Sequence, residues 1–287
     1  MSEFLDAVAN YRFMQYALAT GLLASVACGV VGTYVTMRRI GYIAGGISHC
    51  VLGGLGAANY LNKVHGWTWL QPVYGAVFAA LLAAFIIGFV SLRAREREDT
   101  IIGALWAVGM AAGVLFIART PGYSQDLMSY LFGNILMVTN ADLWMVVVLD
   151  IFVVGLGILF FNQFTAICFD EEFARARGLR VEALYLLLLC LTALTVVLLV
   201  SVVGIVLVIA LLTLPVAVAG QMAHSMGRIM ILSSILCAVF TTGGLALSYA
   251  PNLPAGATII VLAAAAYLAA TLAGAAVRRV RVRSSLK

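Results

Sequence analysis

The stretch that decides the fold is RRIGYIAGGISHCVLGGLG, residues 38–56. It opens with two arginines and continues as an apolar segment whose single acidic or basic side chain is His49. His49 follows Arg39 by ten residues, which is ~15 Å along a helix and about half of a ~30 Å hydrocarbon core. An ionisable side chain at that depth indicates a transport pathway or a binding site. The alternative is a packed histidine that hydrogen-bonds to a neighbouring helix.

Glycine is frequent around this histidine, and it predicts close packing of helices. Six glycines flank His49, with Ser48 beside it. Small side chains allow helix backbones to approach closely inside a membrane. We therefore expect His49 to lie at a tight helix–helix contact; the glycines are at positions 41, 45, 46, 53, 54 and 56.

The composition is that of an all-α, polytopic integral membrane protein. Of 287 residues, 64% are hydrophobic and only 10% are charged, which leaves too little polar surface for a water-soluble domain of this length. We expect one transmembrane domain over 1–287, surrounded by membrane lipid. The net charge of +5 is scattered over segment ends, so it does not indicate a nucleic-acid partner.

The basic residues predict which side of the membrane each loop occupies. Alternate loops hold fourteen of the seventeen Lys and Arg residues, and the positive-inside rule makes these loops cytoplasmic. The N-terminus is then outside, the C-terminus is inside, and the number of crossings is odd. About eight or nine transmembrane helices are expected, most simply nine, from apolar stretches at 14–36, 41–61, 72–92, 100–118, 142–161, 181–203, 204–219, 229–250 and 256–277.

Two regions do not fit a simple count of crossings. Residues 126–139 are apolar but short, and the parity of the loops requires them to stay on the external side as an interfacial or re-entrant piece. The run over 181–219 is interrupted at Ser201 and Gly204, and it predicts one full crossing followed by a short return. We expect Pro215 to end that second helix, and a short helix to lie along the membrane before Arg228.

A second ionisable group also lies within an apolar stretch. Asp150 is the one acidic residue in the middle of a membrane segment. It follows Asp142 by eight residues, ~12 Å into the bilayer, so its predicted depth is close to that of His49. The alternative is a neutral carboxylic acid that hydrogen-bonds to a nearby helix. No GxxxxGK[ST] sequence occurs, so this chain does not bind a nucleotide through such a loop.

Several motifs, taken in order, resemble the permeases of metal-ion ABC importers, the ABC-3 metal permease family. The resemblance implies a permease subunit that moves zinc, manganese or iron into a bacterium across its plasma (inner) membrane. It also implies a cytoplasmic ATPase subunit, an extracytoplasmic metal-binding protein and a homodimer of permeases. The chain itself would not be an enzyme, and the divalent metal would be its substrate rather than a permanent cofactor. The motifs are YALATGLLASVACGVVGTYVTMRRIGYI, GGISHCVLGG, EDTIIGALWAVGMAAGVLF, DLMSYLFGNILMVTNADL, FDEEFARARGL and VVGIVLVIALLTLPVAVAG.

The family signature normally reads Gly-Asp-x-x-Ser-His, and this chain departs from it. Gly45 stands where the Asp would be, four residues before His49 on the same helix face. We take His49 and, as a substitute carboxylate, Asp150 as the candidate metal contacts. A lone imidazole suits Zn²⁺ or Fe²⁺ better than Mn²⁺, but the sequence does not determine which metal is carried.

Two cytoplasmic segments are the predicted contacts with the ATPase. The proline turn over 215–228 is expected to make the main contact, with the loop over 169–178 beside it. The residues expected to couple the subunits are Pro215, Ala219, Gly220, Phe169, Asp170 and Gly178.

Two other functions remain as alternatives. A secondary transporter driven by an ion gradient would need several ionisable groups within the membrane, and His49 and Asp150 are the two that the sequence offers. An intramembrane enzyme would need a HExxH motif, or a Ser/His or paired-Asp arrangement on facing helices. No catalytic residue is expected.

Overall fold

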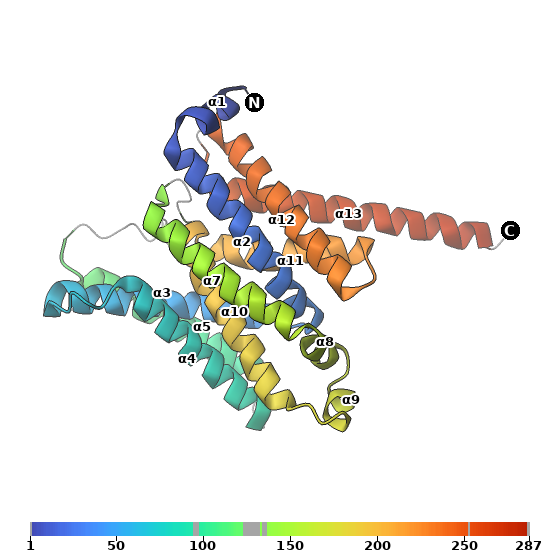
Figure 1. Ribbon diagram of the computed structural model, residues 1–287, viewed down its shortest axis with the longest axis horizontal. Helices are drawn as coiled ribbons and strands as arrows, with labels where there is room; N and C mark the ends of the chain where they lie inside the picture. Colours follow the sequence, from blue (N-terminus) through green and yellow to red (C-terminus); the bar gives the residue numbers. More distant parts are fainter. Residues whose placement is uncertain (1, 94–97, 123–132, 134–136, 252, 286–287) are drawn as a thin grey trace.

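The computed structural model describes residues 2–93, 98–122, 133, 137–251 and 253–285, which form helices joined by short connections. The long helices form a bundle in which α3, α4 and α5 lie on one side and α2, α11, α12 and α13 on the other, with α10 between them and α7 packed against α2 and α10 (Figure 1). The helices are α1 (Ser2–Asn10), α2 (Arg12–Met37), α3 (Gly41–His65), α4 (Pro72–Arg93), α5 (Glu98–Arg119), α7 (Asn140–Leu159), α8 (Phe161–Phe169), α9 (Glu171–Ala176), α10 (Val181–Val203), α11 (Ile205–Met222), α12 (Met226–Tyr249) and α13 (Ala255–Ser285).

Eight of these helices are long and apolar enough to cross a membrane: α2, α4, α5, α7, α10, α11, α12 and α13. Helix α3 has 25 residues, ~37 Å at the usual helical rise, so it too is long enough. Its glycines and the polar residues of its last turns lower its hydropathy, and fourteen of its residues are buried. The prediction of an all-α membrane protein with about eight or nine spanning helices is confirmed.

Helix α3 lies between α4 and α5, and glycine makes both contacts possible. A Cβ atom added to Gly53 would lie 2.8 Å from the carbonyl oxygen of Gly109 in α5. One added to Gly54 would overlap the carbonyl oxygen of Gly75 in α4. Real Cβ atoms do not approach backbone so closely, so the expected tight helix contact at these glycines is confirmed.

Helix α2 is the most buried of the eight spans, and polar contacts fix its position. The Thr33 and Ser233 hydroxyls are 3.3 Å apart across the contact between α2 and α12. On its other side, the Tyr34 hydroxyl donates a 2.8 Å hydrogen bond to the Gly157 carbonyl of α7. Such contacts between helices are favourable because lipid offers polar groups no alternative partner.

The run over 181–219 contains the predicted break but not the predicted ending. Gly204 separates α10 from α11 with a φ of 82°, a conformation that favours glycine. However, Pro215 lies buried inside α11, which continues to Met222, and α12 begins at Met226. The prediction that Pro215 ends the helix, with a short membrane-parallel helix after it, is wrong. A proline is tolerated inside a membrane helix because neighbouring groups compensate for its missing N–H.

The external piece predicted over 126–139 falls mostly outside the described residues, which include only 133 and 137–139 of it. Helix α7 begins directly after it, where Thr139 and Asp142 form a capping box. The Asp142 carboxylate accepts a 2.9 Å hydrogen bond from the Thr139 backbone N–H, which fixes the start of the helix.

Candidate functional site

His49 lies in the middle of α3 and is buried. Its side chain is 7% exposed, and its Nδ1 atom is fully buried with no hydrogen-bond partner in the described part of the chain. The neighbouring Ser48 hydroxyl does not serve it, because that hydroxyl donates to the Gly45 carbonyl at 2.7 Å. A buried imidazole nitrogen without a partner can accept a proton, a water molecule or a metal ion.

The imidazole of His49 stacks on the indole of Trp106 from α5. The two ring centroids are 4.3 Å apart and the planes are inclined by 13°. Trp106 was not among the residues predicted from the sequence, although its position gave a signal. Trp67, Trp69 and Trp144 fall at predicted segment ends, whereas Trp106 lies inside an apolar stretch, away from the interfacial position that membrane tryptophans prefer.

Asp150 is also buried, but it faces a different helix. Its side chain in α7 is 7% exposed, its Oδ1 atom has no hydrogen-bond partner among the described residues, and its carboxyl group lies beside the backbone of Ala27 in α2. His49 faces Trp106 of α5 instead. The structure therefore does not bring the two candidate metal contacts together within one chain. Among the described residues, no three His, Cys, Asp or Glu side chains are close enough to hold a metal ion.

Two of the three candidate coupling residues of α11 are buried. Pro215 and Ala219 are buried, and Ala219 packs in a small cluster with Val216 and Ile229 of α12. Gly220 is half-buried. The exposed part of this region is the three-residue connection 223–225 together with Met222, which is 65% exposed.

The second coupling segment forms an exposed, well-defined short helix. Asp170 caps α9 by accepting a 2.8 Å hydrogen bond from the backbone N–H of Phe173, a standard way to begin a helix. Gly178 ends the segment with a φ of 78°, which suits glycine. Phe169 at the end of α8 and Phe173 of α9 are 68% and 51% exposed, so this segment presents aromatic side chains outside the bundle.

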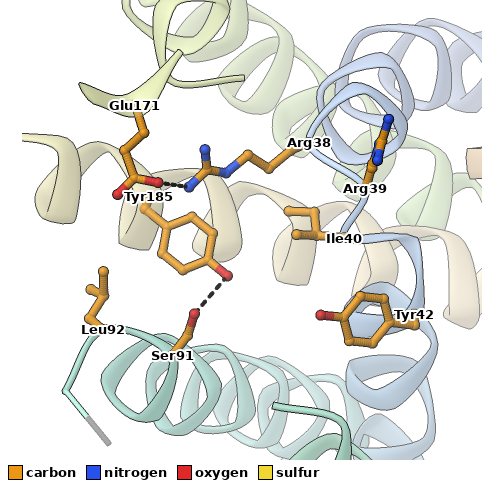
Figure 2. Close-up of a pocket in the computed structure, with 8 residues that line it drawn as sticks. All are labelled: Arg38, Arg39, Ile40, Tyr42, Ser91, Leu92, Glu171 and Tyr185. Atoms are coloured by element: carbon orange, nitrogen blue, oxygen red, sulfur yellow. Dashed lines mark hydrogen bonds and ion pairs between the residues drawn. The ribbon is translucent and has the colours of Figure 1, made fainter. Parts of the chain in front are cut away.

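Arg38, at the end of α2, connects α9 to the bundle, as Figure 2 shows. Its guanidinium donates to the Glu171 carboxylate at 2.7 Å and to the Ile167 carbonyl of α8, and it lies 5.3 Å from the centre of the Tyr185 ring in α10. The hydrogen bond from Arg38 holds the pKa of Glu171 below its usual value.

A cleft of about 330 Å³ opens beside this cluster. Within it, the Ser91 hydroxyl of α4 donates to the Tyr185 hydroxyl at 3.5 Å. The cleft is therefore bordered by α2, α3, α4, α9 and α10, so it lies where the short helix α9 meets four long helices. Its lining residues are Arg38, Arg39, Ile40, Tyr42, Ser91, Leu92, Glu171 and Tyr185.

Comparison with known proteins identifies the family. A model of the ABC 3 transport family matches residues 10–274. The chain belongs to the ABC 3 transport family. Its resemblance to ABC importer permeases, inferred above from the motifs, is thus confirmed, and the chain is a multi-pass membrane protein of that permease type.

Transport proteins of several bacteria are similar to this chain. The chain is 41% identical over 247 residues to a probable metal transport system membrane protein of Chlamydia pneumoniae, covering 86% of this chain and 84% of the relative. It is 34% identical over 269 residues to the manganese transport system membrane protein MntC of Listeria monocytogenes, covering 94% and 93%. The solved structure of PsaBC from Streptococcus pneumoniae, in complex with a Fab, matches with a TM-score of 0.83 and 32% identity over 94% of each chain.

Proposed function

We propose that this chain is the permease subunit of an ABC importer that carries a divalent transition-metal ion, zinc, manganese or iron, into the cell. Family membership and the names of its relatives support this proposal. The observation that carries it is His49: a buried imidazole in the middle of a spanning-length helix, with one nitrogen unpartnered. An ion crossing a membrane loses part of its hydration, and a nitrogen ligand at mid-depth offsets part of that cost.

One chain supplies half of the pathway in this proposal. The described residues contain no cluster of three metal-binding side chains, so a homodimer, which brings a second His49, would complete the coordination. Asp150 is kept as a separate contact. Because it faces α2 rather than His49, it would meet the ion at another step and not as the partner of the same imidazole.

The energy for transport would come from an ATPase subunit that binds on the cytoplasmic side, while a metal-binding protein delivers the ion outside. The burial of the coupling residues of α11 changes which of the two segments is expected to make the main contact with the ATPase. Ala219 and Pro215 are buried, whereas Phe173 of α9 and Phe169 at the end of α8 are exposed. Helix α9 would make the main contact, with the α11–α12 connection beside it. Arg38 would then relay movements of α9 to α2 and, through the short 38–40 turn, to α3.

Uptake measurements on histidine variants test the proposed function. We expect His49→Ala to insert normally and to lose most metal uptake in a deletion strain supplied with zinc, manganese or iron. His65→Ala is the matched control, since its side chain is exposed outside the bundle, and it should transport normally. Asp150→Asn is measured in the same series. Normal uptake by a well-expressed His49→Ala variant would contradict the proposal.

The ATPase contact has its own test. Phe173→Ala should weaken co-purification of the ATPase subunit and reduce metal-dependent ATP hydrolysis, because it removes an exposed aromatic anchor from α9. Phe85→Ala is the control: Phe85 is similarly exposed at 58%, but it lies within the span of α4. If both variants bind the ATPase as the wild type does, α9 is not the contact.

A further inference from the structure

Trp106 separates His49 from the outside of this chain. The indole is stacked on the imidazole with ring centroids 4.3 Å apart. It is 42% exposed, whereas His49 is 7% exposed. The indole is therefore the outer layer, and it covers one face of the imidazole. A flat stack of this kind fixes the plane of the imidazole and so the directions in which its two nitrogens point.

The same indole also occupies the space beside position 45. Gly45 is one turn before His49, on the same face of α3. A Cβ atom added there would lie 3.8 Å from Cζ3 of Trp106 and 3.7 Å from Cδ1 of Ile209, which is ordinary contact. One carbon atom thus fits, but a longer side chain directed toward His49 would meet the indole. Trp106 fills the volume in which a second ligand from α3 would lie.

We propose that Trp106 is the positioning and specificity-determining residue for His49, an inference that rests on the proposed function. Trp106 orients the imidazole and takes the place of a carboxylate next to it. At the depth of His49, each chain then offers the ion one imidazole nitrogen and an indole ring, with no carboxylate from α3. Imidazole suits Zn²⁺, whereas Mn²⁺ favours carboxylate oxygen. The site therefore selects Zn²⁺ over Mn²⁺.

Metal titrations of the purified full-length permease test this inference, with the ratio of Zn²⁺ to Mn²⁺ affinity as the readout. Trp106→Ala should lower Zn²⁺ affinity by about tenfold, as loss of a group that orients a ligand commonly does, and Trp106→Phe should lower it less. Gly45→Asp alone should change the ratio little, because the indole occupies the space. Gly45→Asp combined with Trp106→Ala should shift the ratio toward Mn²⁺ by about tenfold or more.

The control is Val108→Ala, because Val108 lies two residues along α5 from Trp106 and is 67% exposed; it should leave both affinities unchanged. Uptake of labelled zinc and manganese by the complete transporter, with its ATPase and binding protein, should follow the same order. Trp106→Phe and Gly45→Asp give a result even if Trp106→Ala does not fold.

Three outcomes would overturn the inference. If His49→Ala loses Zn²⁺ binding while the Trp106 variants keep the wild-type affinity and ratio, the stack is only packing. If Gly45→Asp by itself shifts the ratio toward Mn²⁺, the indole does not exclude a ligand there. If His49→Ala keeps Zn²⁺ binding and uptake, the proposed function fails first, and the role of Trp106 fails with it.

Discussion

Three glycines of α3 are expected to respond in sharply different ways to the same substitution. In Gly45→Ala the new Cβ would meet Ile209 and Trp106 at 3.7 and 3.8 Å, so the site has room. In Gly54→Ala it would overlap the Gly75 carbonyl oxygen and lie 2.6 Å from the Cβ of Ala79. Backbone atoms of α4 cannot rotate away, so α3 and α4 would have to separate.

The magnitudes follow from this geometry. Replacing glycine by alanine inside a helix contributes up to about 1 kcal/mol through helix propensity, so Gly45→Ala should be neutral or slightly stabilising. Overpacking costs about 1–3 kcal/mol, and at Gly54 it exceeds the gain from propensity. Gly46→Ala should fall between them, because the atom it meets at 2.8 Å is a methyl group of Ile102, a side chain that can adjust.

Thermal unfolding of the purified permease in detergent measures this series. The unfolding temperature should decrease in the order Gly45→Ala, Gly46→Ala, Gly54→Ala, and Gly54→Ala should also reduce the yield of monodisperse protein. Equal unfolding temperatures for Gly45→Ala and Gly54→Ala would refute the reasoning, because they would show that α3 and α4 are not in backbone contact at Gly54.

Three further predictions concern the charged ends of the helices. Arg38→Ala should destabilise the protein more than Glu171→Gln, by about 1–2 kcal/mol in unfolding measurements. Both substitutions remove the partly exposed ion pair, which is worth at most about 1 kcal/mol. Arg38→Ala also removes the hydrogen bond to the Ile167 carbonyl and the contact with the Tyr185 ring. Arg38 lowers the pKa of Glu171, so the ion pair contributes to stability at pH values above the ordinary glutamate pKa of about 4.3. This contribution is lost as the pH falls through the lowered pKa. The stability difference between wild type and Glu171→Gln should therefore disappear in acid. Finally, a cysteine placed at Lys63 should react with a membrane-impermeant reagent in intact cells and one placed at Arg177 should not; the reverse pattern would contradict the predicted orientation.

The positions of the long helices could be predicted from the sequence, and the physical reason is simple. A spanning helix needs about 20 apolar residues, and charged loops must stay in water, so the hydropathy of one chain already locates each segment. The predicted stretches 41–61 and 181–203 became α3 (Gly41–His65) and α10 (Val181–Val203). The break between α10 and α11 at Gly204 could also be predicted from the sequence, because glycine adopts a positive φ without a steric penalty.

Only the tertiary structure decided which faces of the helices meet. Counting along the chain gave His49 and Asp150 similar depths, but depth says nothing about direction: His49 faces Trp106 in α5, and Asp150 faces α2. Pro215 was misjudged because the sequence does not show that packed neighbours can support a proline inside a helix. The amount of apolar sequence thus determined where the chain crosses the membrane, and side-chain packing between distant helices determined what each polar group inside it contacts.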